Sequence, residues 1–308
     1  MYKSSYLLSF YAETPVHMGS GTSVSYVDLP VQRERHTSFP VLWSSGIKGV
    51  LRNFALRKWN NNKEKLDING KEKLDIIFGP GESGEDYSSC ISVTDAKILL
   101  YPVRSVRGVF AWITCPLVLK RFKEDLNSIK SINNNQNTLD FNILDLNILD
   151  ESLIIISENS NLKIENQAKV AFEEFVFRAH EKDLNNLLSF LKELFPENSP
   201  FKDDIINHLA IVSDNVFKDF VNYAVEIRTR IRIDQDKGTA KEGALFTQEL
   251  IPSETIFYSL VFISDPKKSE SNISVNKEIE ELFKGDPILQ LGGDETTGKG
   301  FFRVKLYK

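Results

Sequence analysis

The stretch HMGSGTSVSYVDLPVQRERH, from His17 to His36, lies between a strand-like segment and a helix-like segment. It combines glycine, serine and threonine with acids, two arginines and two of the four histidines of the chain. A connection of this length with so many reactive side chains is typical of a functional loop. We therefore expect this segment to form the functional site and the neighbouring segments to position it.

The segments on either side of the loop have clear patterns. Alternating apolar residues predict a strand over about residues 5–12. After the loop, apolar residues recur at helical spacing and predict a helix over about residues 45–59, with a serine at its start as the cap. Lys48 and Arg52 lie on the polar face of this helix, and a helix N-terminus attracts anions such as RNA phosphate. A plain surface helix with a basic face is the alternative interpretation.

Composition indicates an ordinary soluble globular protein, with 308 residues of which 41% are hydrophobic and 26% charged. No apolar run is long enough to cross a bilayer, and the N-terminus lacks the pattern of a signal peptide. We expect no membrane partner and a cytoplasmic protein. Cys90 and Cys115 are the two cysteines, and their spacing supports neither a disulfide framework nor a structural zinc site.

The formal net charge of −5 argues against a protein that coats nucleic acid indiscriminately. The basic residues nevertheless gather in three stretches, which contain Arg33, Arg35, Lys48 and Arg52, then Arg228, Arg230 and Arg232, then Lys299, Arg303 and Lys305. This pattern is compatible with a basic groove on an acidic body, and equally with solvated faces scattered over the surface.

Period-two alternation between residues 225 and 234 predicts a strand with arginines on one face. Arg228 and Arg230 would project from that face, where guanidinium groups pair well with phosphate. An exposed face balanced by nearby acids is the alternative. Two further strands are expected over about 244–251 and 255–263, and Glu242 and Glu249 are acids of this region with no settled role.

Near the C-terminus, residues 293–299 fit the G-x-x-x-x-G-K pattern of a P-loop. Two features oppose that function, because Gly300 occupies the position of the magnesium-binding Ser or Thr and the following FFRVKLY is a strand pattern. We interpret the segment as a glycine-rich turn between two strands, in which backbone amides and Lys299 lie close to a nucleic-acid backbone. A simple flexible turn is the alternative.

The rest of the chain adds strand-like patterns over 90–114 and 170–177 and an amphipathic helix over about 183–195. The asparagine-rich region from about 120 to 167 is predicted to be a peripheral insertion. The length of 308 residues allows one large domain or two modest ones.

Four segments together carry a family resemblance: ETPVHMGSGTSVSYVDLPVQRERHTSFPVLWSSGIKGVLR, TRIRID, EGALFTQELIPSETIFYS and GGDETTGKGFFRV. In this order they resemble the RAMP superfamily of CRISPR proteins, and more closely the repeated backbone subunit of type III-B (Cmr) effector complexes. The resemblance covers both ends of the chain and leaves residues 120–167 unmatched.

This resemblance implies that residues 1–308 form a single RNA-binding domain of the α+β class. It would have a modified ferredoxin-like (RRM-like) core with a projecting thumb and helical or irregular insertions. It also implies an endoribonuclease that is active in the assembled complex, where copies stack along a CRISPR guide RNA beside other Cmr subunits. Paired single-stranded target RNA would be cut at regular intervals. Asp28 matches the acid that the family uses for cutting, and His17 matches a loop histidine that assists.

The expected chemistry needs few residues. Asp28 would hold a divalent ion, expected to be Mg²⁺, or take a proton from the attacking 2′-hydroxyl. One aspartate is a weak magnesium site, so substrate phosphates would have to complete the coordination. Arg33, Arg35 and the other basic residues would contact the RNA backbone, while base pairing would supply sequence recognition.

Two alternatives remain at this stage. In the first alternative, the protein is a non-catalytic scaffold that only holds the guide RNA, and Asp28 caps the loop. In the second alternative, the protein is a stand-alone RAMP ribonuclease that processes CRISPR RNA by histidine acid–base chemistry.

Overall fold

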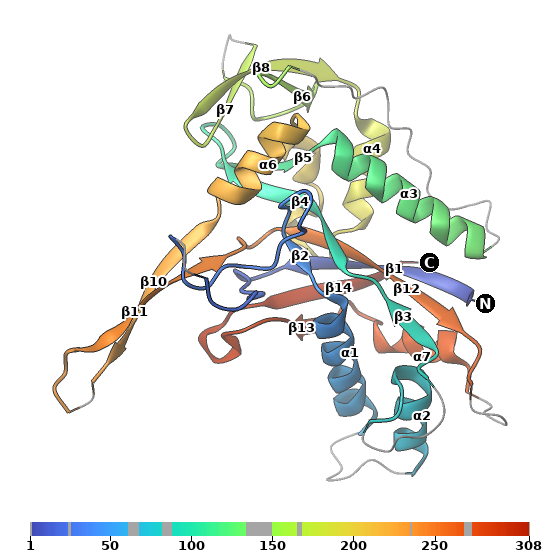
Figure 1. Ribbon diagram of the computed structural model, residues 1–308. Coiled ribbons are helices and arrows are strands. Elements are labelled where there is room, and N and C mark those ends of the chain that lie inside the picture. The colour runs from blue at the N-terminus through green and yellow to red at the C-terminus, as the bar shows by residue number, and fades with distance from the viewer. Residues whose placement is uncertain are drawn as a thin grey trace.

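A computed structural model describes residues 2–23, 26–60, 68–81, 88–133, 150–164, 168–234, 236–267 and 273–307. Within these ranges, twelve strands form one mixed and mostly antiparallel sheet, and helices pack around it (Figure 1). The chain is thus of the α+β class, as the sequence predicted. None of the described helices combines the length and the hydropathy that a membrane crossing requires.

The order of strands in the large sheet differs strongly from their order in the sequence. From one edge to the other they are β13 (Ile288–Gln290), β14 (Phe301–Tyr307), β1 (Tyr2–Ala12), β12 (Ile256–Ser264), β4 (Ala96–Arg104), β5 (Phe110–Thr114), β9 (Leu209–Ile211), β6 (Leu153–Ser157), β8 (Phe175–Lys182) and β7 (Lys169–Phe172). Two short strands, β2 (Val41–Leu42) and β3 (Ile91–Val93), pair with β4 and β12. The two ends of the chain therefore lie side by side, since β1 is hydrogen-bonded to both β12 and β14.

β1 lies inside the sheet between β14 and β12, and both of its faces are covered. Residues 4–12 are all buried, including the three serines Ser4, Ser5 and Ser9. The hydroxyl of Ser9 donates to the carbonyl of Leu194 at 2.7 Å, which satisfies this polar group inside the core. A strand that is buried on both faces reads as a nearly continuous apolar run, as YLLSFYA does.

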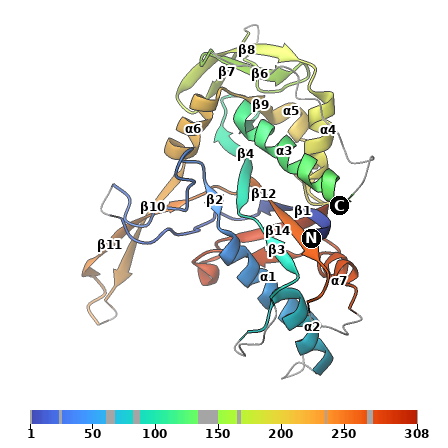
Figure 2. The ribbon, with the colours of Figure 1, turned by 45° about the vertical axis from the view of Figure 1, so that its right-hand side comes forward.

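The helices lie in two groups on opposite sides of β1, β12 and β14 (Figures 1 and 2). One group consists of α1 (Ser44–Trp59), α2 (Ile68–Phe78) and α7 (Val275–Leu282). The other consists of α3 (Pro116–Asn133), α4 (Asn185–Glu193), α5 (Ile205–His208) and α6 (Asp214–Tyr223), and it lies near strands β5 to β9.

A separate two-stranded ribbon, which we call the hairpin, is formed by β10 (Glu226–Ile233) and β11 (Ala240–Leu250). It projects away from the body of the molecule in both views (Figures 1 and 2). Its base continues directly into β12, so the hairpin and the central sheet share one chain segment.

Several sequence predictions are confirmed, namely the first strand, the helix over 45–59 and the helix over 183–195. The strand expected over 170–177 is wrong in one respect, because β7 and β8 form a tight antiparallel pair in this region. The turn between them contains Glu173 at φ 49°, a left-handed conformation that the alternation of apolar residues did not reveal.

The peripheral insertion predicted from about 120 to 167 is also wrong for the described residues of that range. Helix α3 buries Phe122 and Ile129 against the core, and β6 lies inside the sheet between β9 and β8. The apolar residues at helical spacing in α3 outweigh the asparagine-rich composition that suggested an insertion. Residues 134–149 and 165–167 lie outside the described ranges.

Candidate functional site

The long loop between β1 and β2 folds back on itself and lies along the base of β11. Gly19 pairs with Val31, and Leu29 forms a parallel bridge with Gln248 of β11. Val16 pairs with Ile251 at the point where the hairpin joins the body. The loop is therefore fixed by backbone hydrogen bonds to a segment more than two hundred residues away in the sequence.

Asp28 is exposed, and its carboxylate is held by one residue of the hairpin. Oδ2 accepts hydrogen bonds from the backbone N–H of Thr247 at 2.7 Å and from the Thr247 hydroxyl at 2.8 Å. The amide of Asp28 in turn donates to Oγ1 of Thr247 at 3.0 Å. These bonds from the amide and hydroxyl of Thr247 lower the pKa of Asp28, so the carboxylate is ionised at neutral pH.

His17 is buried and fixed by two hydrogen bonds. Its Nδ1 lies 2.8 Å from the carbonyl oxygen of Glu249, and its own carbonyl accepts from the amide of Gly293 at 2.9 Å. The other ring nitrogen faces Gly19, where a Cβ would lie only 2.8 Å from Nε2. Asp28 and His17 are thus attached to β11 two residues apart, at Thr247 and Glu249.

Arg33, which was predicted to contact RNA, is partly buried and makes its hydrogen bonds within the protein. Its guanidinium forms an ion pair with Glu249 and also donates to the carbonyl of Val221 at 2.9 Å. The second carboxylate oxygen of Glu249 accepts from the amide of Val31 at 2.8 Å. Glu249 therefore joins the loop to the hairpin, while the side chain of Glu242 lies outside the described residues.

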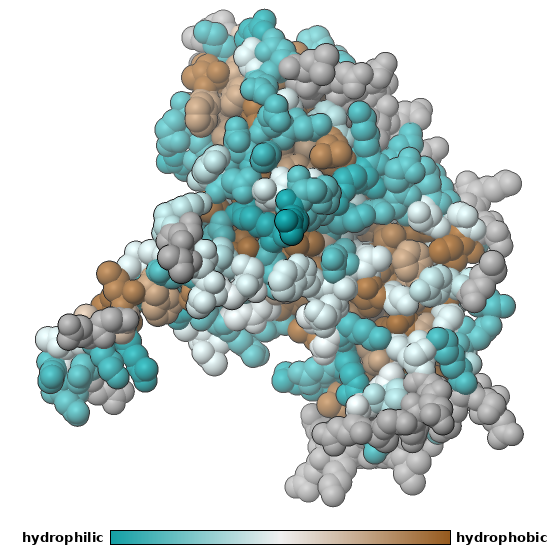
Figure 3. All heavy atoms as spheres, viewed as in Figure 1, coloured by the Kyte–Doolittle hydropathy of each residue, from teal (hydrophilic) through white to brown (hydrophobic). Residues whose placement is uncertain are grey.

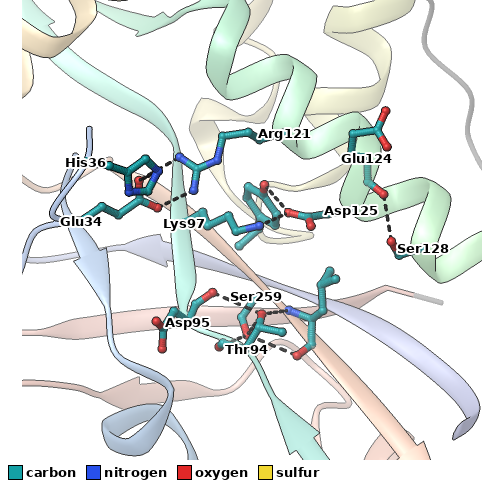
Figure 4. Close-up of polar contacts among 12 residues, drawn as sticks. Glu34, His36, Thr94, Asp95, Lys97, Arg121, Glu124, Asp125, Ser128 and Ser259 are labelled. Carbon is teal, nitrogen blue, oxygen red and sulfur yellow. Dashed lines mark hydrogen bonds and ion pairs between the residues drawn. The ribbon is translucent and has the colours of Figure 1, made fainter. Parts of the chain in front are cut away.

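The end of the loop is tied to helix α3 (Figure 4). Glu34 accepts two hydrogen bonds from the guanidinium of Arg121, at 2.5 and 2.9 Å, and a third from the Thr37 hydroxyl. His36 lies beside this pair, with Nε2 at 3.9 Å from the Glu34 carboxylate. Between these anchored residues Arg35 is exposed, which is compatible with its predicted contact to an RNA backbone.

Helix α1 differs from the prediction at its start. The carboxylate of Asp95 accepts from the amide of Ser44 at 2.7 Å and so occupies a position at the helix N-terminus that was expected to attract phosphate. No serine side chain caps the helix, whose N-cap residue is Trp43. Lys48 is partly buried, and burial lowers its pKa, while Arg52 forms an ion pair with Asp75 of α2 at 3.1 Å.

The arginines of the hairpin have separate surroundings. Arg228 forms an ion pair with Glu226, and Arg232 is exposed. Arg230 lies over the ring of Phe246 and donates to the carboxylate of Asp294 at 2.6 Å. Of the predicted row of guanidinium groups, Arg230 is therefore engaged within the protein, while Arg228 and Arg232 are exposed.

The opposite face of the hairpin is apolar and open to solvent. Ile227, Ile231, Ile233 and Leu245 are all about half exposed or more. Hydrophobic residues are visible on the projecting arm in Figure 3. The alternation predicted for this strand is thus present. The loop and the C-terminal turn cover the base of the hairpin, where Gln248 and Glu249 are buried, and the apolar residues beyond the base remain available for contact.

The C-terminal glycine-rich segment forms a turn between β13 and β14, as predicted, and is followed by a strand rather than a helix. Gly292 has φ 91°, and a Cβ there would lie 2.4 Å from the carbonyl oxygen of His17. Gly300 has φ 73°, and a Cβ would lie 2.0 Å from the Leu291 carbonyl. Glycine is required at Gly292 because the turn packs against the loop, and at Gly300 because the two sides of the turn approach each other closely. Lys299 is partly exposed beside Gly300.

The residues around Asp28 offer little to a metal ion without substrate. Among the described residues, no three His, Cys, Asp or Glu side chains come together as ligands. One oxygen of Asp28 is engaged by Thr247, which leaves Oδ1 as the donor from this carboxylate. This set fits a magnesium ion only as a single protein ligand, with phosphate oxygens and water as the others.

Three residues of this region were not identified from the sequence: Thr247, Gln248 and Asp294. Thr247 and Gln248 lie in a strand pattern in which their side chains look like ordinary polar positions. Asp294 lies inside the false P-loop pattern. Only the long-range pairing of loop, hairpin and turn reveals that Thr247 holds Asp28 and that Asp294 binds the neighbouring Gln248.

The sequence matches the RAMP superfamily over residues 9–303. It is 40% identical over 303 residues to "CRISPR system Cmr endoribonuclease Cmr4" of Pyrococcus furiosus, covering 98% of this chain and 95% of that protein. The structure is similar to the crystal structure of oligomeric Cmr4 from the same organism, with a TM-score of 0.69 and 34% identity over 98% of this chain and 97% of the other.

A subunit of the type III-B Cmr-beta complex bound to cognate target RNA has the same fold. The TM-score is 0.75 at 22% identity, and the match covers 99% of this chain and 98% of the other. The family match, which extends from β1 to β14, agrees with the pairing of the two chain ends in the central sheet. This chain belongs to the RAMP superfamily.

Proposed function

We propose that this chain is the backbone subunit of a type III-B (Cmr) CRISPR effector complex in the cytoplasm. It binds guide RNA, stacks with further copies of itself beside other Cmr subunits, and cleaves paired target RNA at regular intervals. The observation that carries the proposal is the identity of 40% to a Cmr endoribonuclease across nearly the whole chain. In this proposal the chain is one RNA-binding domain with a ferredoxin-like core, and the hairpin is its projecting thumb.

Asp28 is the proposed cleavage residue because it is the exposed carboxylate of the loop and is held in one orientation. Hydrogen bonds from Thr247 fix Oδ2 and leave Oδ1 directed away from that contact. The lowered pKa keeps Asp28 ionised. A permanent anion is better suited to electrostatic work or metal ligation than to proton transfer, since a general base is most effective when its pKa is near the working pH.

A divalent ion bound by Asp28 and by phosphate oxygens would stabilise negative charge on the scissile phosphate. The chain itself contributes the oriented carboxylate, and Arg35 of the loop and Lys299 of the glycine-rich turn are accessible basic residues for the RNA backbone. His17 supports the site from inside, because it is buried and its Nδ1 is engaged by the Glu249 carbonyl. This burial disfavours a stand-alone ribonuclease that relies on histidine as an exposed acid or base.

The test is the product pattern of the assembled complex. Target RNA paired to the guide is expected to yield fragments that differ by a constant length, and chelation of divalent ions is expected to stop the cutting. Binding of guide and target without any cutting, in the presence of Mg²⁺, would contradict the proposed activity.

A non-catalytic scaffold is the second candidate, and one observation favours it. The bonds between Asp28 and Thr247 are also those of a carboxylate that caps a loop. The two functions differ in what Asp28→Ala does. Loss of cutting with intact RNA binding supports the nuclease, whereas loss of assembly gives Asp28 a structural role.

A further inference from the structure

Asp294 forms a closed ring of hydrogen bonds with both strands of the hairpin. Its Oδ1 accepts from Nη1 of Arg230 on β10 at 2.6 Å, and its Oδ2 accepts from Nε2 of Gln248 on β11 at 2.6 Å. The third side of the ring is a 3.0 Å bond from Arg230 to Oε1 of Gln248. A carboxylate that binds two neighbouring strands in this way fixes them to each other and to its own turn.

The ring is shielded from water, which strengthens it. Gln248 is buried, and the side chains of Asp294 and Arg230 are 21% and 33% exposed. Burial raises the pKa of Asp294, but the hydrogen bonds from Arg230 and Gln248 outweigh it and lower the pKa overall. Asp294 is therefore an anion at neutral pH that is satisfied by protein donors.

The ring is joined directly to Asp28 through the backbone of β11. Gln248 follows Thr247, the residue whose amide and hydroxyl hold the Asp28 carboxylate. Leu29, next to Asp28, donates to the carbonyl of Thr247 and accepts from the amide of Glu249, both at 3.0 Å. A displacement of Gln248 would consequently move both donors of Asp28.

The same turn also contacts His17. The amide of Gly293, adjacent to Asp294, donates to the carbonyl of His17 at 2.9 Å. His17 contacts β11 through its ring, at the carbonyl of Glu249. Asp294 thus lies where the C-terminal turn, the hairpin and the first loop meet.

We propose that Asp294 is a positioning residue for the cleavage site, acting through Gln248 and the turn to keep Asp28 and His17 in a fixed relation. The inference rests on the proposed nuclease function and deepens it. It also assigns a role to Arg230, which pairs with Asp294 and supports the site from within the protein instead of binding RNA.

The test uses the assembled complex with guide RNA and compares Asp294→Asn with Glu295→Gln. Both variants replace a carboxylate by an amide of nearly equal size in the same turn, but Glu295 is exposed and only its carbonyl is hydrogen-bonded here. We expect Asp294→Asn to lower the single-turnover cutting rate at saturating target by about 10- to 100-fold, as small displacements in active sites do. Glu295→Gln should cut at the wild-type rate.

A second measurement, the affinity for target RNA, distinguishes a positioning role of Asp294 from a purely structural one. Target affinity should be unchanged in Asp294→Asn, so that the rate falls while the half-saturating concentration does not. Arg230→Gln should lower the rate similarly, and the double variant should be no slower than the slower single variant, because both changes break the same ring. Additive losses, or a loss of guide or target binding, would overturn the inference.

Asp28→Asn is run in parallel so that the two proposals fail separately. If cutting depends on Asp28 but Asp294→Asn cuts at the wild-type rate, the positioning role is wrong and the nuclease function stands. If cutting does not depend on Asp28, or wild type does not cut, the proposed function fails and the positioning role fails with it.

Discussion

At the scale of single residues, the site depends on how Thr247 orients one carboxylate. The side chain of Asp28 is exposed, so its environment differs from bulk water mainly through the two hydrogen bonds that Thr247 donates. An exposed aspartate without such donors would rotate freely. β11 therefore fixes the orientation of this carboxylate and leaves Oδ1 outside the contact with Thr247.

Thr247→Val tests this orientation because it removes the hydroxyl and keeps the shape and the backbone amide. We expect the cutting rate to fall roughly tenfold, the effect of one hydrogen bond to a charged group. Thr229→Val is the matched control, since Thr229 is the cross-strand partner of Thr247 on β10 and does not contact Asp28. Equal rates for the two variants in a single-turnover assay would argue against the orienting bond.

Arg33 and Arg35 are two residues apart, but we expect substitution of Arg33 to lower stability and substitution of Arg35 to weaken RNA binding. Arg33→Met leaves Glu249 buried and unpaired, so the free energy of unfolding should fall by about 3 kcal/mol. Arg35→Ala removes an exposed side chain and should leave stability within about 0.5 kcal/mol of wild type while weakening RNA binding. Denaturant unfolding and a guide-binding assay check both, and a stable Arg33→Met variant would count against the structural role.

At the scale of elements, the loop is held at one end by the hairpin and at the other by α3. Glu34 and Arg121 form the second attachment (Figure 4). Burial raises the pKa of Glu34, but hydrogen bonds from Arg121 and Thr37 and the nearby charge of Arg121 lower it overall. A lowered folded-state pKa means that the unfolded chain takes up the proton first as the pH falls.

The stability contributed by Glu34 should therefore be complete at pH 7 and lost as the pH falls below its ordinary value of about 4.5 toward the folded-state pKa. Glu34→Gln should lower the unfolding free energy by roughly 2 kcal/mol at pH 7 and by less at pH 3.5. Urea unfolding at both values measures this. Glu124→Gln, at an exposed position of α3, is the control and should show no such difference.

At the scale of the whole molecule, the predictions from sequence succeeded where the signal was local. Periodicity predicted β1 and α1, and the residues after Lys299 excluded a P-loop because they form β14. The ion pair of Arg33 could not be predicted, because its partner Glu249 is 216 residues away and nothing near Arg33 in the sequence indicates this contact. Asp95 at the start of α1 and Asp294 beneath Arg230 are further partners that only the folded chain brings into place.

The ion pairs within the protein also determine which basic residues are available to bind RNA. Arg33, Arg52 and Arg230 are paired inside the protein, while Arg35, Arg228 and Arg232 remain exposed. An acidic protein with a net charge of −5 can still bind an RNA backbone through such a limited set.

Replacing Arg228 and Arg232 together by glutamine should weaken guide binding and reduce the slope of log affinity against log salt by about 1 to 2. The reason is that fewer counterions are released when fewer phosphates are neutralised. Lys284→Gln, at an exposed position after α7, is the control. An unchanged salt slope in the double variant would show that the hairpin arginines do not contact the backbone.

We propose that Asp28, held by Thr247, cuts the target RNA, and one measurement tests this role most directly. Complexes assembled with wild-type, Asp28→Asn or Asp265→Asn chains are given the same paired target under single-turnover conditions, and both binding and regularly spaced products are quantified. Asp265 is an exposed acid that follows β12 and pairs with Lys3, so its variant should cut normally. We predict that Asp28→Asn binds guide and target with wild-type affinity and yields no regularly spaced products. Undiminished cutting by Asp28→Asn would contradict the account.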